Sequence, residues 1–305
     1  MDTQTTDSKP KESARALLTE IIDYAGLFPP SQISMAEAVT NYAAYKNSNY
    51  RWMLGRFIVP VARLDEFMEH ADRFVIGDAA NAWRLSVLAG EDVYESIRRL
   101  DRFNSENATR VLCDALEVKA SIVSQIENTI SALPGYLTAY FELPLGENLA
   151  DLVSTLAIRG QCAKIRTGGL TADAFPSTAE IIRFTRTCLA ANVPFKATAG
   201  LHHPIRCFKP LTYAPDAPSG MMHGFLNVSL AAGFARQGFK SNILEGVLED
   251  EFPESFEFSD GGVVWHQDYI LTVPQIALMR RNNLISFGSC SFEETIADLQ
   301  EIGLL

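Results

Sequence analysis

Short apolar runs and amphipathic segments alternate along most of the chain, and this alternation limits the possible folds more than any other feature. Each short run has the length and side-chain alternation of a β-strand, and the segment that follows repeats its apolar residues at helical spacing. Eight such pairs predict an α/β fold, a single (β/α)8 barrel of the TIM type. A doubly wound open sheet is the alternative for the same pattern.

The expected strands cover residues 57–61, 83–88, 110–115, 137–143, 162–167, 195–199, 284–287 and one segment within 255–265. The expected helices after them cover residues 64–74, 92–103, 121–132, 149–156, 177–190, 224–237, 274–281 and 293–302. Which part of 255–265 forms strand seven is left open, because residues 241–250 before it are typical of a helix.

The pattern also predicts two extra helices before the first strand, over residues 14–24 and 35–45. Residues 23–30 between them contain Gly26 and two prolines, and we interpret them as the end of the first helix. After strand six, residues 202–223 are too long for an ordinary connection and predict a lid or wall of the site. The domain prediction is a flexible polar tail at 1–12 and one barrel domain at 13–305.

Composition excludes several classes of partner. With 47% apolar and 21% charged residues the chain is typical of a globular protein, and its net charge of -11 argues against nucleic acid and anionic membranes as partners. Five scattered cysteines and no secretory leader indicate a soluble, cytoplasmic protein. We expect a small anionic metabolite as partner, and we leave a homo-oligomer open.

Charged residues alternate with apolar ones in two neighbouring strands. Lys164 and Arg166 share one face of 162–167, and Lys196 and Thr198 share one face of 195–199. The apolar face must meet the helices, so these polar side chains are expected to point into the barrel, with Asp114 and Glu142 as possible carboxylate partners. The competing interpretation is a buried ionic network that only fills the barrel.

The last strand ends in a glycine–serine turn just before a helix. Gly288, Ser289 and Ser291 therefore predict a phosphate or carboxylate site at the helix N-terminus. Plain helix capping is the alternative, because Ser291 and Glu294 have the spacing of a capping box.

The run Lys196-Ala197-Thr198-Ala199-Gly200 resembles the lysine-x-threonine-x-glycine strand of deoxyribose-phosphate aldolase and related class I aldolases. The turn from Phe287 to Ser291 is similar to the phosphate-binding turn of that family. The resemblance covers about a dozen residues. It implies a lyase in which Lys196 forms a Schiff base with a small anionic carbonyl compound.

The sequence departs from that family because it has no lysine after Lys240, where the family carries a second lysine that tunes the first. We expect Lys164 to take that role and Asp114 or Glu142 to move protons. Arg166, Thr198, the Gly288–Ser289–Ser291 turn, His202 and His203 are expected to bind the substrate or its anionic group. No cofactor is expected, with a metal left open.

Two other functions compete with this hypothesis. A metal-dependent hydrolase or lyase would draw its ligands from His202, His203, His223 and His266, although no HxH or HExxH spacing is present. Alternatively, one of these histidines acts without metal. The second competitor is a barrel that binds an anion without turnover.

Cys290 stands at the start of the last expected helix, where a thiol pKa is lowered. Because its own segment contains no histidine, we interpret it as a small packing residue.

Overall fold

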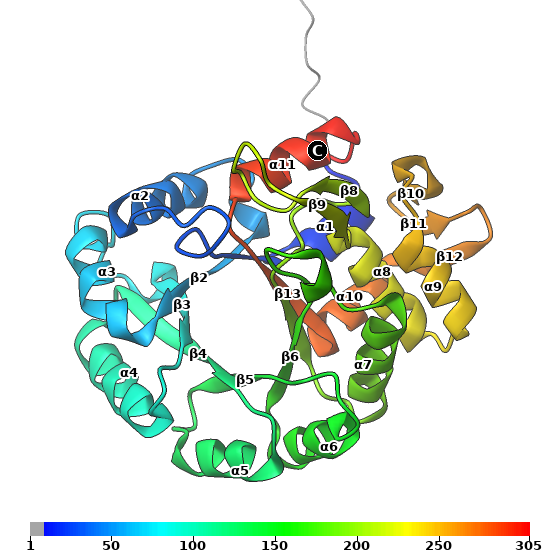
Figure 1. Ribbon diagram of the computed structural model, residues 1–305. Helices are drawn as coiled ribbons and strands as arrows, with labels where there is room; N and C mark the ends of the chain where they lie inside the picture. Colours follow the sequence, from blue (N-terminus) through cyan, green and yellow to red (C-terminus); the bar gives the residue numbers. More distant parts are fainter. Residues whose placement is uncertain (1–8) are drawn as a thin grey trace, which may run out of the picture.

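Eight parallel strands close into a barrel in the computed structural model, which describes residues 9–305 (Figure 1). Around the barrel their order is β1-β13-β7-β6-β5-β4-β3-β2. The barrel strands are β1 (Ile22–Tyr24), β2 (Leu54–Pro60), β3 (Trp83–Leu88), β4 (Val111–Lys119), β5 (Thr138–Glu142), β6 (Cys162–Arg166), β7 (Phe195–Thr198) and β13 (Leu284–Ser289). The predicted (β/α)8 barrel is confirmed.

Helices surround the barrel and cover the apolar outer faces of its strands (Figure 1). They are α1 (Glu12–Leu18), α2 (Met35–Lys46), α3 (Leu64–Ala71), α4 (Val93–Asn107), α5 (Val123–Ala132), α6 (Leu149–Arg159), α7 (Thr178–Ala190), α8 (Phe225–Arg236), α9 (Ser241–Glu249), α10 (Val273–Asn282) and α11 (Phe292–Glu301). Local sequence sets several of their ends. The N-terminus of α7 carries a capping box of Ser177 and Glu180, and α6 ends at Gly160 in the left-handed conformation.

The first strand of the barrel lies where the sequence predicted the end of a helix. The helix expected at 14–24 stops at Leu18, and residues 22–24 form β1 between β13 and β2. The prediction was wrong because all three residues of β1 are buried. A run of three residues buried on both faces is too short for its periodicity to separate strand from helix.

The segment 255–265 does not enter the barrel. It forms β10 (Phe256–Phe258) and β11 (Gly262–Trp265), and β11 pairs antiparallel with both β10 and β12 (Tyr269–Thr272) at the outer edge of the molecule (Figure 1). The expected strand seven was therefore wrong, and β1 completes the set of eight. The helix expected at 241–250 is present as α9.

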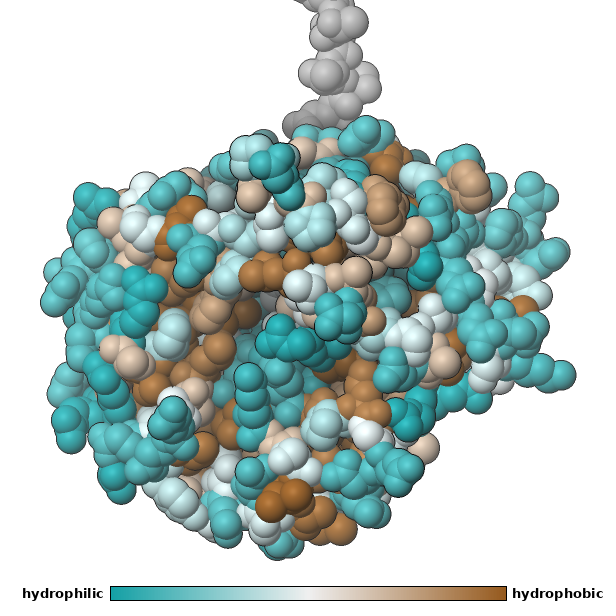
Figure 2. Space-filling model, viewed as in Figure 1, coloured by the Kyte–Doolittle hydropathy of each residue, from teal (hydrophilic) through white to brown (hydrophobic). Residues whose placement is uncertain are grey.

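The long segment after β7 contains an antiparallel hairpin of β8 (Cys207–Pro210) and β9 (Ser219–Met222). The polar tail expected at residues 1–12 falls largely on residues 1–8, which lie outside the described part of the chain. Within residues 9–305, no helix is long and apolar enough to cross a membrane. The centre of the face drawn in Figure 2 is hollowed, and both hydrophilic and hydrophobic residues border the hollow.

Candidate active site

A fully buried lysine on β7 is held between two carboxylates from other strands. Nζ of Lys196 lies 2.6 Å from Oδ2 of Asp23 on β1 and 2.6 Å from Oε1 of Glu117 on β4. All three side chains are at most 2% exposed. They meet because inward-facing positions of parallel strands form layers across a barrel.

The second lysine shares one of these carboxylates. Nζ of Lys164 on β6 lies 2.7 Å from Oε2 of Glu117 and 2.9 Å from Oε2 of Glu142 on β5. Glu142 in turn accepts a hydrogen bond from Nε of Arg166, at 3.2 Å. The charges thus form one chain from Asp23 to Arg166, with three carboxylates and three cations, which we call the ionic chain.

Neutral groups fix the carboxylates in place. Ser86 donates to Oε1 of Glu117 at 2.6 Å, and Ser286 donates to Oδ2 of Asp23 at 2.8 Å. The backbone N–H of Arg56 donates to the other oxygen of Asp23 at 2.8 Å. Each buried oxygen therefore has a partner, which a buried carboxylate requires.

The ionic chain controls which groups carry charge. Burial alone would lower the pKa of Lys196, but the adjacent carboxylates of Asp23 and Glu117 outweigh burial and raise that pKa. Burial would raise the pKa of Glu117, but the two lysine ammonium groups hold it well below its usual range. The pKa of Glu142 is also lowered, against burial, by Lys164 and Arg166. Lys196 and both glutamates are therefore charged at neutral pH.

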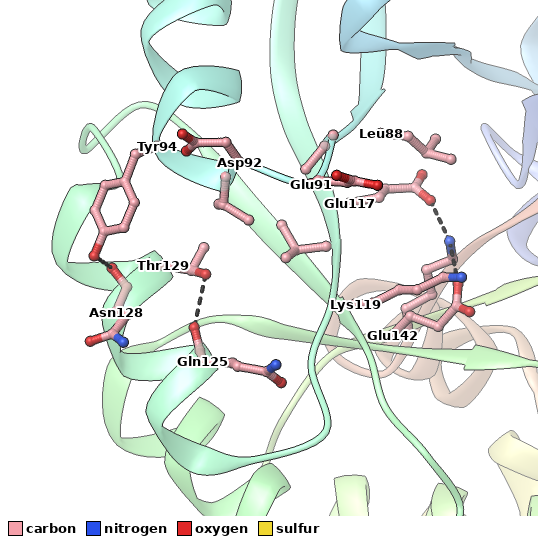
Figure 3. A pocket seen from close by; sticks show the side chains of 15 residues that line it. Leu88, Glu91, Asp92, Tyr94, Glu117, Lys119, Gln125, Asn128, Thr129 and Glu142 are labelled. Atoms are coloured by element: carbon pink, nitrogen blue, oxygen red, sulfur yellow. Dashed lines mark hydrogen bonds and ion pairs between the residues drawn. The ribbon is translucent and has the colours of Figure 1, made fainter.

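A cavity of about 1050 Å³ opens beside the ionic chain (Figure 3). Its lining includes Lys164, Glu117 and Glu142, whereas Lys196 is not part of that lining. Figure 3 shows Glu117 and Glu142 at one end, and Tyr94 and Asn128 at the other, on α4 and α5.

A second cavity of about 590 Å³ shares Lys119, Gln125 and Glu142 with the first and reaches Arg166. A small molecule bound beside Lys164 would therefore have two cationic side chains, Lys119 and Arg166, within the adjoining space.

Asp114, an expected proton carrier, lies away from the two lysines. It precedes Glu117 by three residues on β4 and forms ion pairs with Arg56 at 2.6 Å and Arg84 at 3.0 Å. Those arginines stand near the starts of β2 and β3, so Asp114 belongs to the amino-terminal end of the barrel.

The glycine–serine segment at the end of β13 takes part in capping helix α11. Oγ of Ser291 accepts a hydrogen bond from the N–H of Glu294, and Oγ of Ser289 donates to the carbonyl of Ser291 at 2.9 Å. Gly288 lies opposite Thr198 on β7, which is paired on its other side with Arg166. Of the expected anion-binding residues, Gly288, Thr198 and Arg166 are thus neighbours, and the hydroxyls of Ser289 and Ser291 already have partners.

Each of the four histidines expected as metal ligands contacts a different partner. Nδ1 of His203 lies 2.6 Å from Asp298, and Nε2 of His266 lies 3.0 Å from Asp250. His223 contacts the carbonyl of Pro176, and His202 lies beside Cys290. Among residues 9–305, no three histidine, cysteine or acidic side chains converge as metal ligands would.

The sequence analysis missed Asp23 and Glu117, the two carboxylates that hold Lys196. Simple alternation did not point to Glu117, because the expected inward position of Asp114 places Glu117 on the outward face. A shift in the β3–β4 pairing between Cys113 and Ala115 turns Glu117 inward. Asp23 had no signal either, because its segment was assigned to a helix.

The fold and this site define an α/β barrel with a charged cluster next to a cavity, which is compatible with an enzyme. No protein-family model matches the sequence, and no curated protein matches it.

Proposed function

We propose that the protein is a lyase of the class I aldolase type, which acts on a small carbonyl compound with an anionic group through a lysine imine. The observation that carries the proposal is a pair of buried lysines that share Glu117, one of them facing a cavity. Lysines buried beside charged partners at a cavity are typical of catalytic sites.

The arrangement favours Lys164 as the nucleophile, and Lys196 lies deeper in the barrel, outside the lining of the cavity. Lys164 lines the cavity, whereas Lys196 is 1% exposed and its pKa is raised, so it remains an ammonium. In this role Lys196 keeps Glu117 ionised and fixes its position. The resemblance to class I aldolases would instead place the imine on Lys196, and the experiment below separates the two.

The proton transfers fall to Glu142, which contacts Lys164 and also lines the cavity. Glu142 takes a proton from the Lys164 ammonium, and the freed amine attacks the carbonyl carbon to give a carbinolamine. Glu142 returns the proton to the hydroxyl, which leaves as water, and a protonated imine remains. Glu142 then takes the proton of a β-hydroxyl group while the adjacent carbon–carbon bond breaks and its electron pair enters the imine.

Arg166 and Lys119 supply the anion-binding charge in this proposal. The side chain of Arg166 is about half exposed and lines the second cavity together with Lys119. A guanidinium binds phosphate or carboxylate oxygens with two parallel hydrogen bonds.

The test is chemical trapping. The protein is incubated with phosphorylated and carboxylated aldehydes and ketones, reduced with borohydride, and examined by intact mass and peptide mapping. An adduct on Lys164 that is lost in Lys164→Arg, which keeps the charge, supports the proposal. The matched control is Lys209→Arg, on the exposed strand β8.

An adduct on Lys196 would keep the reaction class and exchange the roles of the two lysines. No adduct with any carbonyl compound, beside a positive imine-forming enzyme, would contradict the proposal and favour a barrel filled by an ionic network.

A further inference from the structure

A cysteine–histidine pair lies at the end of the last barrel strand, outside the ionic chain. Sγ of Cys290, the residue after β13, lies 3.7 Å from Nδ1 of His202, which comes from the segment after β7. The histidine that Cys290 lacks in its own segment is thus supplied by a distant one, so the interpretation as a packing residue is replaced by the proposal below.

The backbone that delivers His202 is held in an unusual conformation. Ala199 and Gly200 have φ angles of +61° and +75°, and the first is unfavourable for a residue with a side chain. The hydroxyl of Thr167 donates to the carbonyl of Ala199 at 2.6 Å, and Gly200 packs against Gly168 so closely that a Cβ on either would clash. Tight contacts therefore fix the turn that places His202 beside β13.

One residue of the β8–β9 hairpin lies against the sulfur. Tyr213, between the two hairpin strands, has its hydroxyl 4.0 Å from Sγ and donates that proton to Glu294 at 2.7 Å. Cys290 is 5% exposed, whereas Tyr213 is 58% exposed. A movement of one hairpin would therefore open the thiol to small molecules.

Two of the groups around Cys290, His202 and Ser31, favour its ionised form. Tyr24 from β1, Tyr213 from the hairpin and Glu294 from α11 surround the pair together with His202. Burial would raise the pKa of Cys290, but hydrogen bonds from His202 and Ser31 outweigh it and lower that pKa. Burial would lower the pKa of His202, but its hydrogen bond to Cys290 raises that pKa.

We propose that Cys290 and His202 form a thiolate–imidazolium pair that adds reversibly to a small uncharged aldehyde. The thiolate sulfur bonds to the carbonyl carbon, the carbonyl electron pair moves to oxygen, and that oxygen takes the proton from His202 to give a thiohemiacetal. A carbonyl is the electrophile that uses both members of the pair. An uncharged aldehyde is favoured over an anionic one, because Glu293 and Glu294 in the adjacent first turn of α11 repel negative charge.

The first test is alkylation by uncharged iodoacetamide over a range of pH, read by peptide mapping of the native protein. Cys207 on β8 is the internal control, because burial raises the pKa of its thiol to about 11. We expect Cys290 to react about 10-fold faster than Cys207 at pH 7, with an apparent pKa below the usual value of about 8.5. Equal or slower reaction of Cys290 would overturn the proposal.

Two variants separate the effect of His202 on the pKa of Cys290 from the shielding of the thiol by Tyr213. His202→Gln should slow alkylation of Cys290 about fivefold or more at pH 7 and raise its apparent pKa. Tyr213→Ala should speed alkylation of Cys290 and leave the apparent pKa of its thiol low. A purely structural role of His202 would not explain opposite effects of the two variants. An unchanged profile in a folded His202→Gln protein, checked by circular dichroism, would refute the pair.

Aldehyde binding is tested by whether an aldehyde protects Cys290 from alkylation. Propionaldehyde should slow alkylation of Cys290, the effect should disappear on dialysis, and the anionic glyoxylate should protect much less. The same result is expected in Lys164→Arg, so the outcome is independent of the imine proposal. Absence of protection at millimolar propionaldehyde would exclude aldehyde addition.

Discussion

Replacing Lys196 with methionine tests whether the ionic chain is as tightly coupled as its geometry indicates. The change removes the ammonium that contacts Asp23 and Glu117 at 2.6 Å but keeps most of the apolar volume. Breaking a buried ion pair by removing one partner costs roughly 3–5 kcal/mol, because a buried charge is left uncompensated.

The lower end of that range applies here, since both carboxylates retain partners. Glu117 keeps Lys164 and Ser86, and Asp23 keeps Ser286 and a backbone N–H. We therefore expect a loss of about 3 kcal/mol in the free energy of unfolding at pH 7. For a chain of this length, an unfolding entropy of about 2.1 cal/mol/K per residue converts that loss into a melting temperature lower by about 5 °C.

The effect should depend on pH with a definite sign. The lowered pKa of Glu117 contributes stability that is present above its unfolded pKa of about 4.3 and is lost as the pH falls through the folded pKa. Lys196→Met removes one of the two ammonium groups that lower this pKa, so Glu117 is protonated at a higher pH in the variant. The difference in stability between the two proteins should therefore narrow as the pH falls below about 4.3.

Urea unfolding followed by circular dichroism at pH 7 and pH 3.5 measures both effects, with Lys209→Met on the protein surface as the control. A loss of less than about 1 kcal/mol at pH 7 would mean that the ammonium contributes little beyond filling space. A stability difference that stays constant or grows between pH 4.3 and pH 3.5 would refute the assigned charge states.

Three further changes test the surroundings of the site. Asp114→Asn weakens the ion pairs with two arginines and should lower the free energy of unfolding by about 2 kcal/mol, while borohydride trapping is unchanged. A loss of trapping would show that Asp114 takes part in the reaction. Asn104→Ala removes two 2.8 Å hydrogen bonds to the backbone of Cys113 and should lower the free energy of unfolding, measured in urea, by about 2–4 kcal/mol. A loss below about 1 kcal/mol would mean that a water molecule replaces the amide. Inorganic phosphate should compete with the substrate and so reduce borohydride trapping, and Arg166→Gln should weaken this protection about 10-fold. An unchanged phosphate affinity of the variant in calorimetry would mean that the anion site lies elsewhere.

Local sequence patterns were sufficient for most of the barrel wall. The strand at 83–88 was predicted with its observed bounds, and β5, β6 and β7 differ from their predictions by one or two residues. These strands are bounded by turns and followed by amphipathic helices, so local periodicity identifies them. The inward direction of Lys164 and Lys196 follows from the same alternation, because only one face of each strand is apolar.

The membership of the barrel and the partners of the lysines were decided only in the tertiary structure. Residues 22–24 and residues 256–265 are both plausible strands by local criteria, and the closure of the sheet between β13 and β2 selects the first. Likewise, 173 residues separate Lys196 from Asp23, and 88 separate Cys290 from His202. Sequence fixes which side chains turn inward through a period of two residues, whereas the order and stagger of the strands around the closed barrel determine which of them meet.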